Sequence, residues 1–178
     1  KEEVNSTVSK LRKATDTREA LALFREHSRE ELQSDLDFTA EVFGKAVNGF
    51  MNENLRELRK VLTAVEEKKI HLKQVKRVGT LGVTQLDHDI AVEKGLYYYQ
   101  GNDFASEIIC SIRRLAEPMK AHIDNNFSPL SPVQKDDFGK VSEQIISFLR
   151  NCAIMIRKND YIGFEELIAE SITLMNQL

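Results

Sequence analysis

The strongest constraint on the fold is a helical apolar period in residues 87–126. Apolar or small residues follow one another there at gaps of three and four, which places them on one stripe of an α-helix: Tyr97, Gly101, Phe104, Ile108, Ile112, Leu115, Met119 and Ile123. At 1.5 Å per residue this segment predicts a rod of roughly 55 to 60 Å. We therefore expect a central helix of a long bundle, with this stripe facing the core.

The same period predicts further helices in the rest of the chain. We expect helical structure over about residues 16–48, in one or more pieces, and helices over about 55–86, 131–158 and 164–175, with a short helix over residues 4–15. Cap-like sequences begin at Asp16 and again at Ser28, so residues 1–35 are predicted to form short N-terminal helices. Whether Ser28 begins a new helix or lies inside a continuous one stays open.

Two prolines and a serine mark the later helices. Pro118 lies inside the central helix and is expected to bend it. Ser131 is the clearest N-cap, since Pro132 follows at the first helical position and Gln134 stands at the third. Asn52 or Asn54 is expected to cap the helix that starts near residue 55.

The pattern as a whole predicts an all-α fold. The chain of 178 residues has only three prolines and eight glycines, and no hairpin sequence occurs in it. Short connections between long helices make sequential neighbours antiparallel. We predict a single domain over residues 1–178, an up-down bundle of about four main helices.

Charge and composition exclude several classes of partner. A formal net charge of −3 gives no reason to expect nucleic acid or an anionic membrane. The sequence has no run of 18 apolar residues, so it predicts no membrane insertion by this segment, and its start has no signal-peptide pattern. Cys110 and Cys152 lack CxxC spacing, which favours a reducing, cytoplasmic compartment. The chain does not begin with methionine, as expected of a piece of a longer protein.

Sequence motifs for catalysis are not found. The chain has no GxxxxGK[ST] phosphate loop, no HExxH zinc motif and no GxSxG elbow. None of the four histidines has a glutamate three residues before it, as a di-iron bundle requires. We therefore expect a protein that is not an enzyme.

Carboxylates four residues apart on the central helix have the spacing of a metal site, and Asp89 and Glu93 repeat the pattern of Asp103 and Glu107. Asp103 and Glu107 lie four residues apart on one flank of the central helix, where they could supply two oxygen ligands. The alternative is that they are solvated or paired with Arg113, Arg114 and lysines of a facing helix.

Two charged patches have similar alternatives. Each is either a solvated helix face or a contact site, for metal in the acidic patch and for phosphate or a membrane surface in the basic run. The acidic patch is Asp35, Asp37 and Glu41, and the basic run is Lys68, Lys69, Lys73, Lys76 and Arg77.

Three consecutive tyrosines occupy three faces of the central helix. One should be in the core, and Tyr97 lies on the predicted buried stripe. Tyr98 and Tyr99 are then candidates for contacts at helix seams or with a partner.

Residues 96–108, together with Pro118 and the His-Ile-Asp-Asn-Asn sequence at 122–126, resemble a known family. They are similar to the cytoplasmic C-terminal domain of PiT-type inorganic phosphate permeases of Bacteroides-like bacteria, a part of the wider PhoU-like set of phosphate-transport regulators. Residues 52–72 also resemble the start of a PhoU helix. The resemblance implies a regulatory domain that docks on the membrane domain of a phosphate permease, or on a second copy as a homo-oligomer.

The resemblance has further implications. PhoU-like proteins hold metal through carboxylate pairs, so it implies a divalent or ferric ion at Asp103 and Glu107. It also implies a cytoplasmic location with a tether to the inner membrane. The alternative function from another class is a metal-binding carboxylate bundle, either a metal store or a metal-dependent enzyme.

Overall fold

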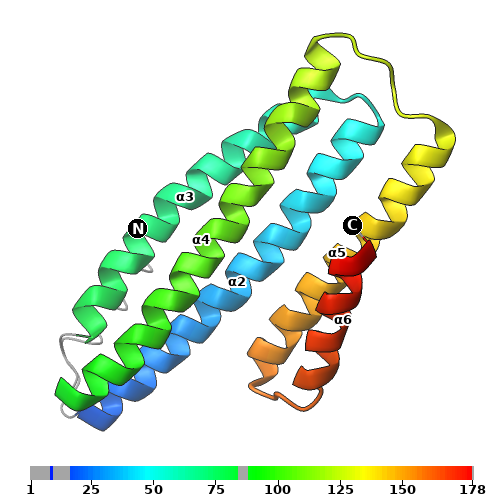
Figure 1. The fold of residues 1–178 in the computed structure, drawn as a ribbon. Coiled ribbons are helices and arrows are strands. Elements are labelled where there is room, and N and C mark those ends of the chain that lie inside the picture. Colours follow the sequence, from blue (N-terminus) through cyan, green and yellow to red (C-terminus); the bar gives the residue numbers. More distant parts are fainter. Residues whose placement is uncertain (1–8, 10–16, 84–87, 178) are drawn as a thin grey trace.

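The computed structural model describes residue 9, residues 17–83 and residues 88–177. Within these ranges the side chains of residues 17, 78, 81–83, 88–97 and 177 are not described. Five helices follow in order, and the described residues contain no strand: α2 (Thr17–Met51), α3 (Leu55–Val83), α4 (His88–Asp124), α5 (Pro132–Lys158) and α6 (Phe164–Gln177) (Figure 1). The predicted all-α class is confirmed.

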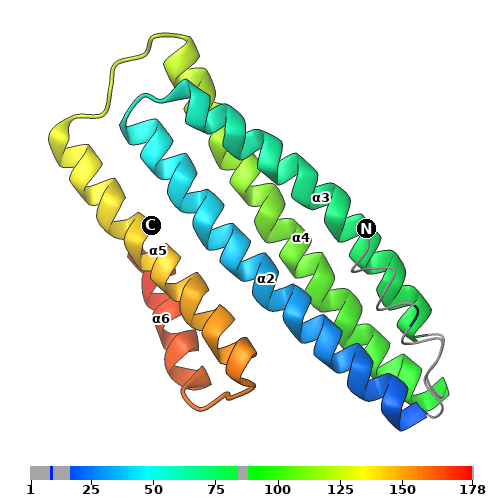
Figure 2. The same ribbon diagram turned by 180° about the vertical axis from the view of Figure 1, so that it is seen from behind.

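The long helices form an up-down arrangement with two parts. Helices α2, α3 and α4 pack on one another as a three-helix bundle. Helix α5 packs on the other side of α2, and α6 packs on α5 (Figures 1 and 2). Among the described residues, neither α5 nor α6 packs on α4. The helices therefore form a closed bundle of three with a helical hairpin beside it.

Helix ends follow the predicted capping chemistry. The side chain of Ser131 accepts from the backbone N–H of Gln134, and Gln134 Oε1 accepts from the backbone N–H of Ser131, at 3.3 and 2.9 Å. Asn54, one of the two predicted caps, accepts from the N–H of Glu57 at 3.1 Å. Helix α5 ends at Asn159 in the left-handed conformation, with φ 49°.

The prediction of short helices over residues 1–35 is wrong from residue 17 onward. Residues 17–35 are the first half of the continuous helix α2. Ser28 lies inside it and its hydroxyl donates to the carbonyl of Phe24 at 2.7 Å, so the cap-like sequence is a satisfied mid-helix serine. The helix predicted over residues 4–15 and the predicted helix end at residue 86 lie outside the described residues.

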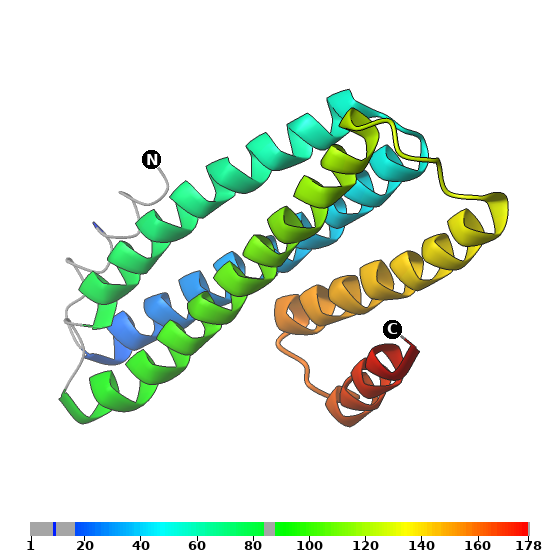
Figure 3. The same cartoon turned by 45° about the horizontal axis from the view of Figure 1, so that its top comes forward.

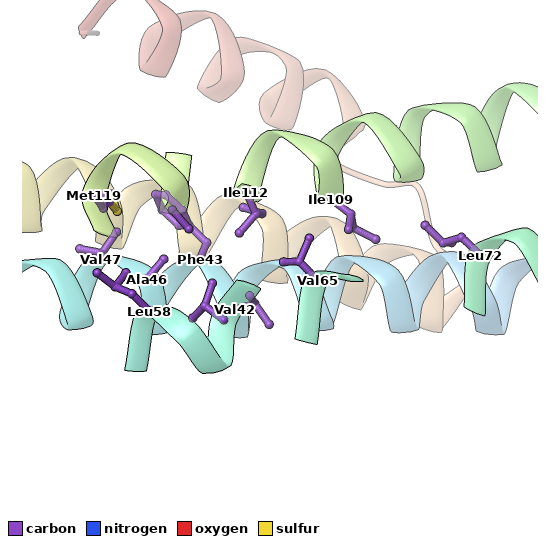
Figure 4. Close-up of a cluster of buried hydrophobic side chains, with 12 residues drawn as sticks. Val42, Phe43, Ala46, Val47, Leu58, Val65, Leu72, Ile109, Ile112 and Met119 are labelled. Carbon is purple, nitrogen blue, oxygen red and sulfur yellow. The ribbon is translucent and has the colours of Figure 1, made fainter. Parts of the chain in front are cut away.

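The main core lies where α2, α3 and α4 meet. Figure 4 shows most of its members pointing toward one another from the three helices. It consists of twelve buried side chains: Val42, Phe43, Ala46, Val47, Leu58, Val61, Val65, Leu72, Ile109, Ile112, Ala116 and Met119. Phe138, Ile145 and Ile146 of α5 pack against it from across α2.

The predicted stripe of α4 faces the core in only part of its width. Ile112 and Met119 are buried, but Phe104, Ile108 and Leu115 are 69%, 36% and 38% exposed. The packed side lies about a quarter-turn away and carries Ala105, Ile109 and Ala116, which are all buried. Small side chains let helix axes approach closely, so this side packs and the bulkier side stays open.

Neighbouring isoleucines on α4 test this register. Ile109 is fully buried, so Ile109→Ala is expected to lower the free energy of unfolding by about 2–5 kcal/mol. Ile108 is 36% exposed, so Ile108→Ala should cost less than about 1.5 kcal/mol. Urea unfolding followed by circular dichroism measures both. A larger loss of stability in Ile108→Ala than in Ile109→Ala would show that the predicted stripe, and not the side that carries Ile109, faces the core.

Candidate interaction surface

The uncovered side of α4 forms one wall of a groove above α2. We call it the α2–α4 groove, and it is lined by Leu32, Asp35, Leu36, Thr39, Gly101, Phe104, Ala105 and Ile108. Gly101 has no side chain and Ala105 a short one, and nothing lies within 4 Å of the position that a Cβ on Gly101 would take, so this part of the α4 wall is recessed. Because α5 packs on α2 but not on α4, no described helix covers this wall.

A second apolar strip runs along the outer side of α6. Leu174 is buried, whereas four large side chains on the outer side are 45–65% exposed. This strip, the α6 ridge, consists of Phe164, Ile168, Ile172 and Met175. Their spacing of three or four residues places them on one stripe. Helices α4 and α6 both lie toward the viewer in Figure 1, where α2 runs between them, and in Figure 3 α2 lies behind α4.

The groove continues into a wider hollow beside the N-terminal half of α2. Leu32 lines both, and Ile156 of α5 and Tyr161 after it form the opposite wall. The α2 side of this hollow carries two arginines, Arg25 and Arg29, and one glutamate, Glu26, which pairs with Arg29.

Tyr98 is a core residue, which corrects its assignment as a partner contact. It is 6% exposed, its ring lies 4.8 Å from that of Phe24, and its hydroxyl donates to the carbonyl of Val75 at 3.0 Å. Burial raises the pKa of this phenol. Tyr99 is half-buried and its hydroxyl donates to Thr80 Oγ1 at 3.1 Å. Tyr98 is thus a core tyrosine, and the prediction for Tyr97 is not tested because its side chain lies outside the described residues.

Gly79 of α3 makes room for the Tyr98 ring. A Cβ at this position would lie 1.9 Å from Tyr98 Cε1, far inside any allowed contact. The glycine therefore lets α3 and α4 approach with the ring between them. The sequence around Gly79 gives no local sign of this role, because the partner ring lies on another helix.

This close contact predicts an unusual response to alanine. Gly79→Ala should lower the free energy of unfolding by about 1–3 kcal/mol, although alanine is the better helix former. Gly139→Ala in α5, where nothing lies within 4 Å, should instead stabilise by about 0.5–1 kcal/mol. Thermal melts of the two variants compare them directly. Equal effects would show that the ring does not occupy the space beside Gly79.

A buried ion pair joins α2 to α3. Lys68 Nζ lies 2.6 Å from Asp35 Oδ1, and the side chains are only 10% and 4% exposed. Burial raises the pKa of the Asp35 carboxyl, and the nearby Lys68 ammonium opposes this shift. About one turn along the same two helices, His71 Nε2 lies 3.1 Å from Glu31 Oε2.

Several of the other predicted charged residues form ion pairs at the surface. Ion pairs join Lys69 to Glu66 at 3.2 Å and Lys76 to Asp103 at 2.8 Å. On the acidic side Asp37 lies 3.5 Å from Arg157, and Glu41 pairs with Lys45. Sequence reasoning placed Asp35 and Lys68 in two separate patches, and only the tertiary packing joins them.

Removing Lys68 tests the buried pair. The pKa of Asp35 is raised above its ordinary 3.8 in the folded chain. The stability that this shift contributes is therefore fully present below pH 3.8, and it is lost as the pH rises through the pKa of Asp35 in the folded state. Lys68→Met removes the cation that opposes this shift and should cost about 3–5 kcal/mol at pH 7.5, and less as the pH is lowered to 4.5, because protonation of Asp35 removes the unpaired buried charge. Urea unfolding at both pH values measures the difference from the unmodified chain.

A double variant provides the control. Lys68→Met with Asp35→Leu removes both charges and should recover most of the stability at pH 7.5. A cost for Lys68→Met that is independent of pH would contradict the role assigned to Asp35.

The two predicted metal ligands form ion pairs with two different basic side chains. Asp103 faces Lys76, and Glu107 Oε1 accepts from Arg114 at 2.7 Å. Their side chains are 66% and 61% exposed. The ranges described in the structure contain no group of three or more His, Cys, Asp or Glu residues that could hold a metal ion. The ion-pair alternative is therefore the arrangement that the geometry favours.

Comparisons with known protein families, curated proteins and solved structures found no match for this chain. Within the described ranges, no helix combines the length and the apolar character needed to cross a membrane.

Proposed function

We propose that this chain is a PhoU-like regulatory domain of inorganic phosphate transport that acts by docking. Its docking surface is the side of the bundle that carries the α2–α4 groove and the α6 ridge. The partner is the membrane domain of a phosphate permease, a related transport component or a second copy of the chain. The domain performs no catalysis in this proposal, and it is cytoplasmic, tethered to the inner membrane as the permease's C-terminal region.

The observation that carries the docking part is the open wall of α4. Phe104 is 69% exposed in the middle of the longest helix, while the smaller Ala105 beside it is 5% exposed. Phenylalanine in water forgoes the stabilisation that burial of its ring would provide. With Ile108 and Leu115 on the same wall, this points to a surface that a partner covers.

The phosphate-transport part rests on the resemblance in residues 96–126. The geometry contributes a mechanism for it. A domain that binds one conformation of a permease more tightly than the other shifts the gating equilibrium by the difference in binding free energy. An apolar groove on a rigid bundle is suited to such a role, because it costs little conformational entropy on binding.

The metal alternative lacks a comparable observation. Asp103 and Glu107 already have cationic partners in the chain, and each pair is exposed. A regulatory surface therefore accounts for more of the described residues than a metal store does.

Phosphate uptake by cells tests the proposal. Deleting the domain, or replacing Phe104 with Glu, is expected to change the initial uptake rate of labelled phosphate roughly fivefold or more in starved or replete cells. Ile70→Glu, at a 53% exposed residue of α3 outside the docking surface, should leave uptake unchanged. Unchanged uptake after deletion, in both starved and replete cells, would contradict the proposal.

A further inference from the structure

We infer that the occupant of the α2–α4 groove is the α6 ridge of a second copy, and that the exchange is reciprocal. Each chain inserts its own ridge into its partner's groove, so two copies form a closed dimer about a two-fold axis. This inference rests on the proposed function, because it names a second copy of the chain as the partner that occupies the proposed docking surface.

The amount of apolar surface left in water fits a dimer interface. The relevant side chains are Phe104, Ile108 and Leu115 of α4 and the four residues of the α6 ridge. Their exposed fractions, applied to roughly 200 Å² for a residue of this size, leave roughly 700 Å² of apolar surface per copy. A standard protein interface buries about 800 Å² per partner. One chain thus exposes close to the area that a stable pair of chains needs.

The two strips are complementary in shape. The groove is hollow, because Gly101 and Ala105 line its floor and no described helix covers the α4 wall. The ridge is a single helix that packs only on α5 among the described elements, so its outer side projects from the molecule. The helices that carry them, α4 and α6, both lie toward the viewer in Figure 1. A recess beside a ridge on one surface is the arrangement in which two identical surfaces can interlock.

The charges beside the two strips are of opposite sign. Helix α6 carries Glu165, Glu166 and Glu170 and no lysine or arginine. The hollow that extends the groove carries Arg25 and Arg29 against the single Glu26. An acidic helix entering a groove with a basic end is favoured by electrostatic complementarity. This points to a second copy's α6 and disfavours a basic helix of another protein.

Sedimentation of the purified chain tests the inference. Sedimentation velocity from about 1 to 300 µM should show a monomer–dimer equilibrium. Ile168→Glu on the ridge and Phe104→Glu on the groove should each weaken dimerisation by roughly tenfold or more. Ile70→Glu is the matched control, because it makes the same change at a similarly exposed residue on α3, and it should leave the equilibrium unchanged. Circular dichroism checks that the three variants are folded.

Mixing two variants distinguishes reciprocal exchange from a simple apolar contact. A Phe104→Glu copy keeps its ridge, and an Ile168→Glu copy keeps its groove. One intact ridge-in-groove contact can therefore form between them, and the mixture should dimerise more strongly than either variant alone. Equal dimerisation in the mixture and in the separate variants would overturn the exchange.

Two other results would also overturn the inference. One is a wild-type chain that stays monomeric at 300 µM, and the other is a dimer that Ile70→Glu weakens as much as Ile168→Glu does. These outcomes are independent of phosphate uptake. If Phe104→Glu changes uptake while the wild-type chain is a monomer, the proposed function stands with another partner; if the dimer forms and deletion leaves uptake unchanged, the proposed function fails.

Discussion

The close packing of the small-residue side of α4 against α2 and α3 is the contact on which the rest of the structure depends. The short side chains of Ala105 and Ala116 let the helix axes approach. Ile109 packs between the helices, and its side chain is fully buried. This contact rotates α4 so that Phe104 faces outward. The same rotation therefore produces both the tight core and the apolar wall of the groove. A helix with bulky residues on all sides would not pack more closely through one face than through another.

Two specific contacts stabilise this arrangement along the bundle. The Tyr98 ring lies in the space left by Gly79, which ties α4 to α3. The Lys68–Asp35 pair ties α3 to α2, at the level where the groove begins. Both contacts tolerate little displacement, because one is limited by steric overlap and the other would leave a buried charge without its partner. The groove is thus built on a framework that holds its floor in place.

The α5–α6 hairpin lies beside the three-helix bundle and does not cover all of α2. Helix α5 packs on the side of α2 opposite the bundle, so the strip of α2 between α4 and the hairpin has no described helix over it. A fourth helix placed there would be in contact with α2, α4 and the hairpin, as in a four-helix bundle. The proposed function and the proposed dimer both follow from this unfilled position: a partner's helix supplies the burial that the chain lacks.

The sequence by itself determined the helical class, most helix boundaries and the Ser131 cap, because these depend on local periodicity and on residues within one turn of each other. It also predicted α4 as one long helix. Only the tertiary structure decided which side of α4 is buried, since the apolar arc was wider than the core needed and Ala105 competes with Phe104 for it. Likewise Tyr98, Gly79, Asp35 and Lys68 have distinctive roles only through partners on other helices, and a one-dimensional pattern contains no information on which helices become neighbours.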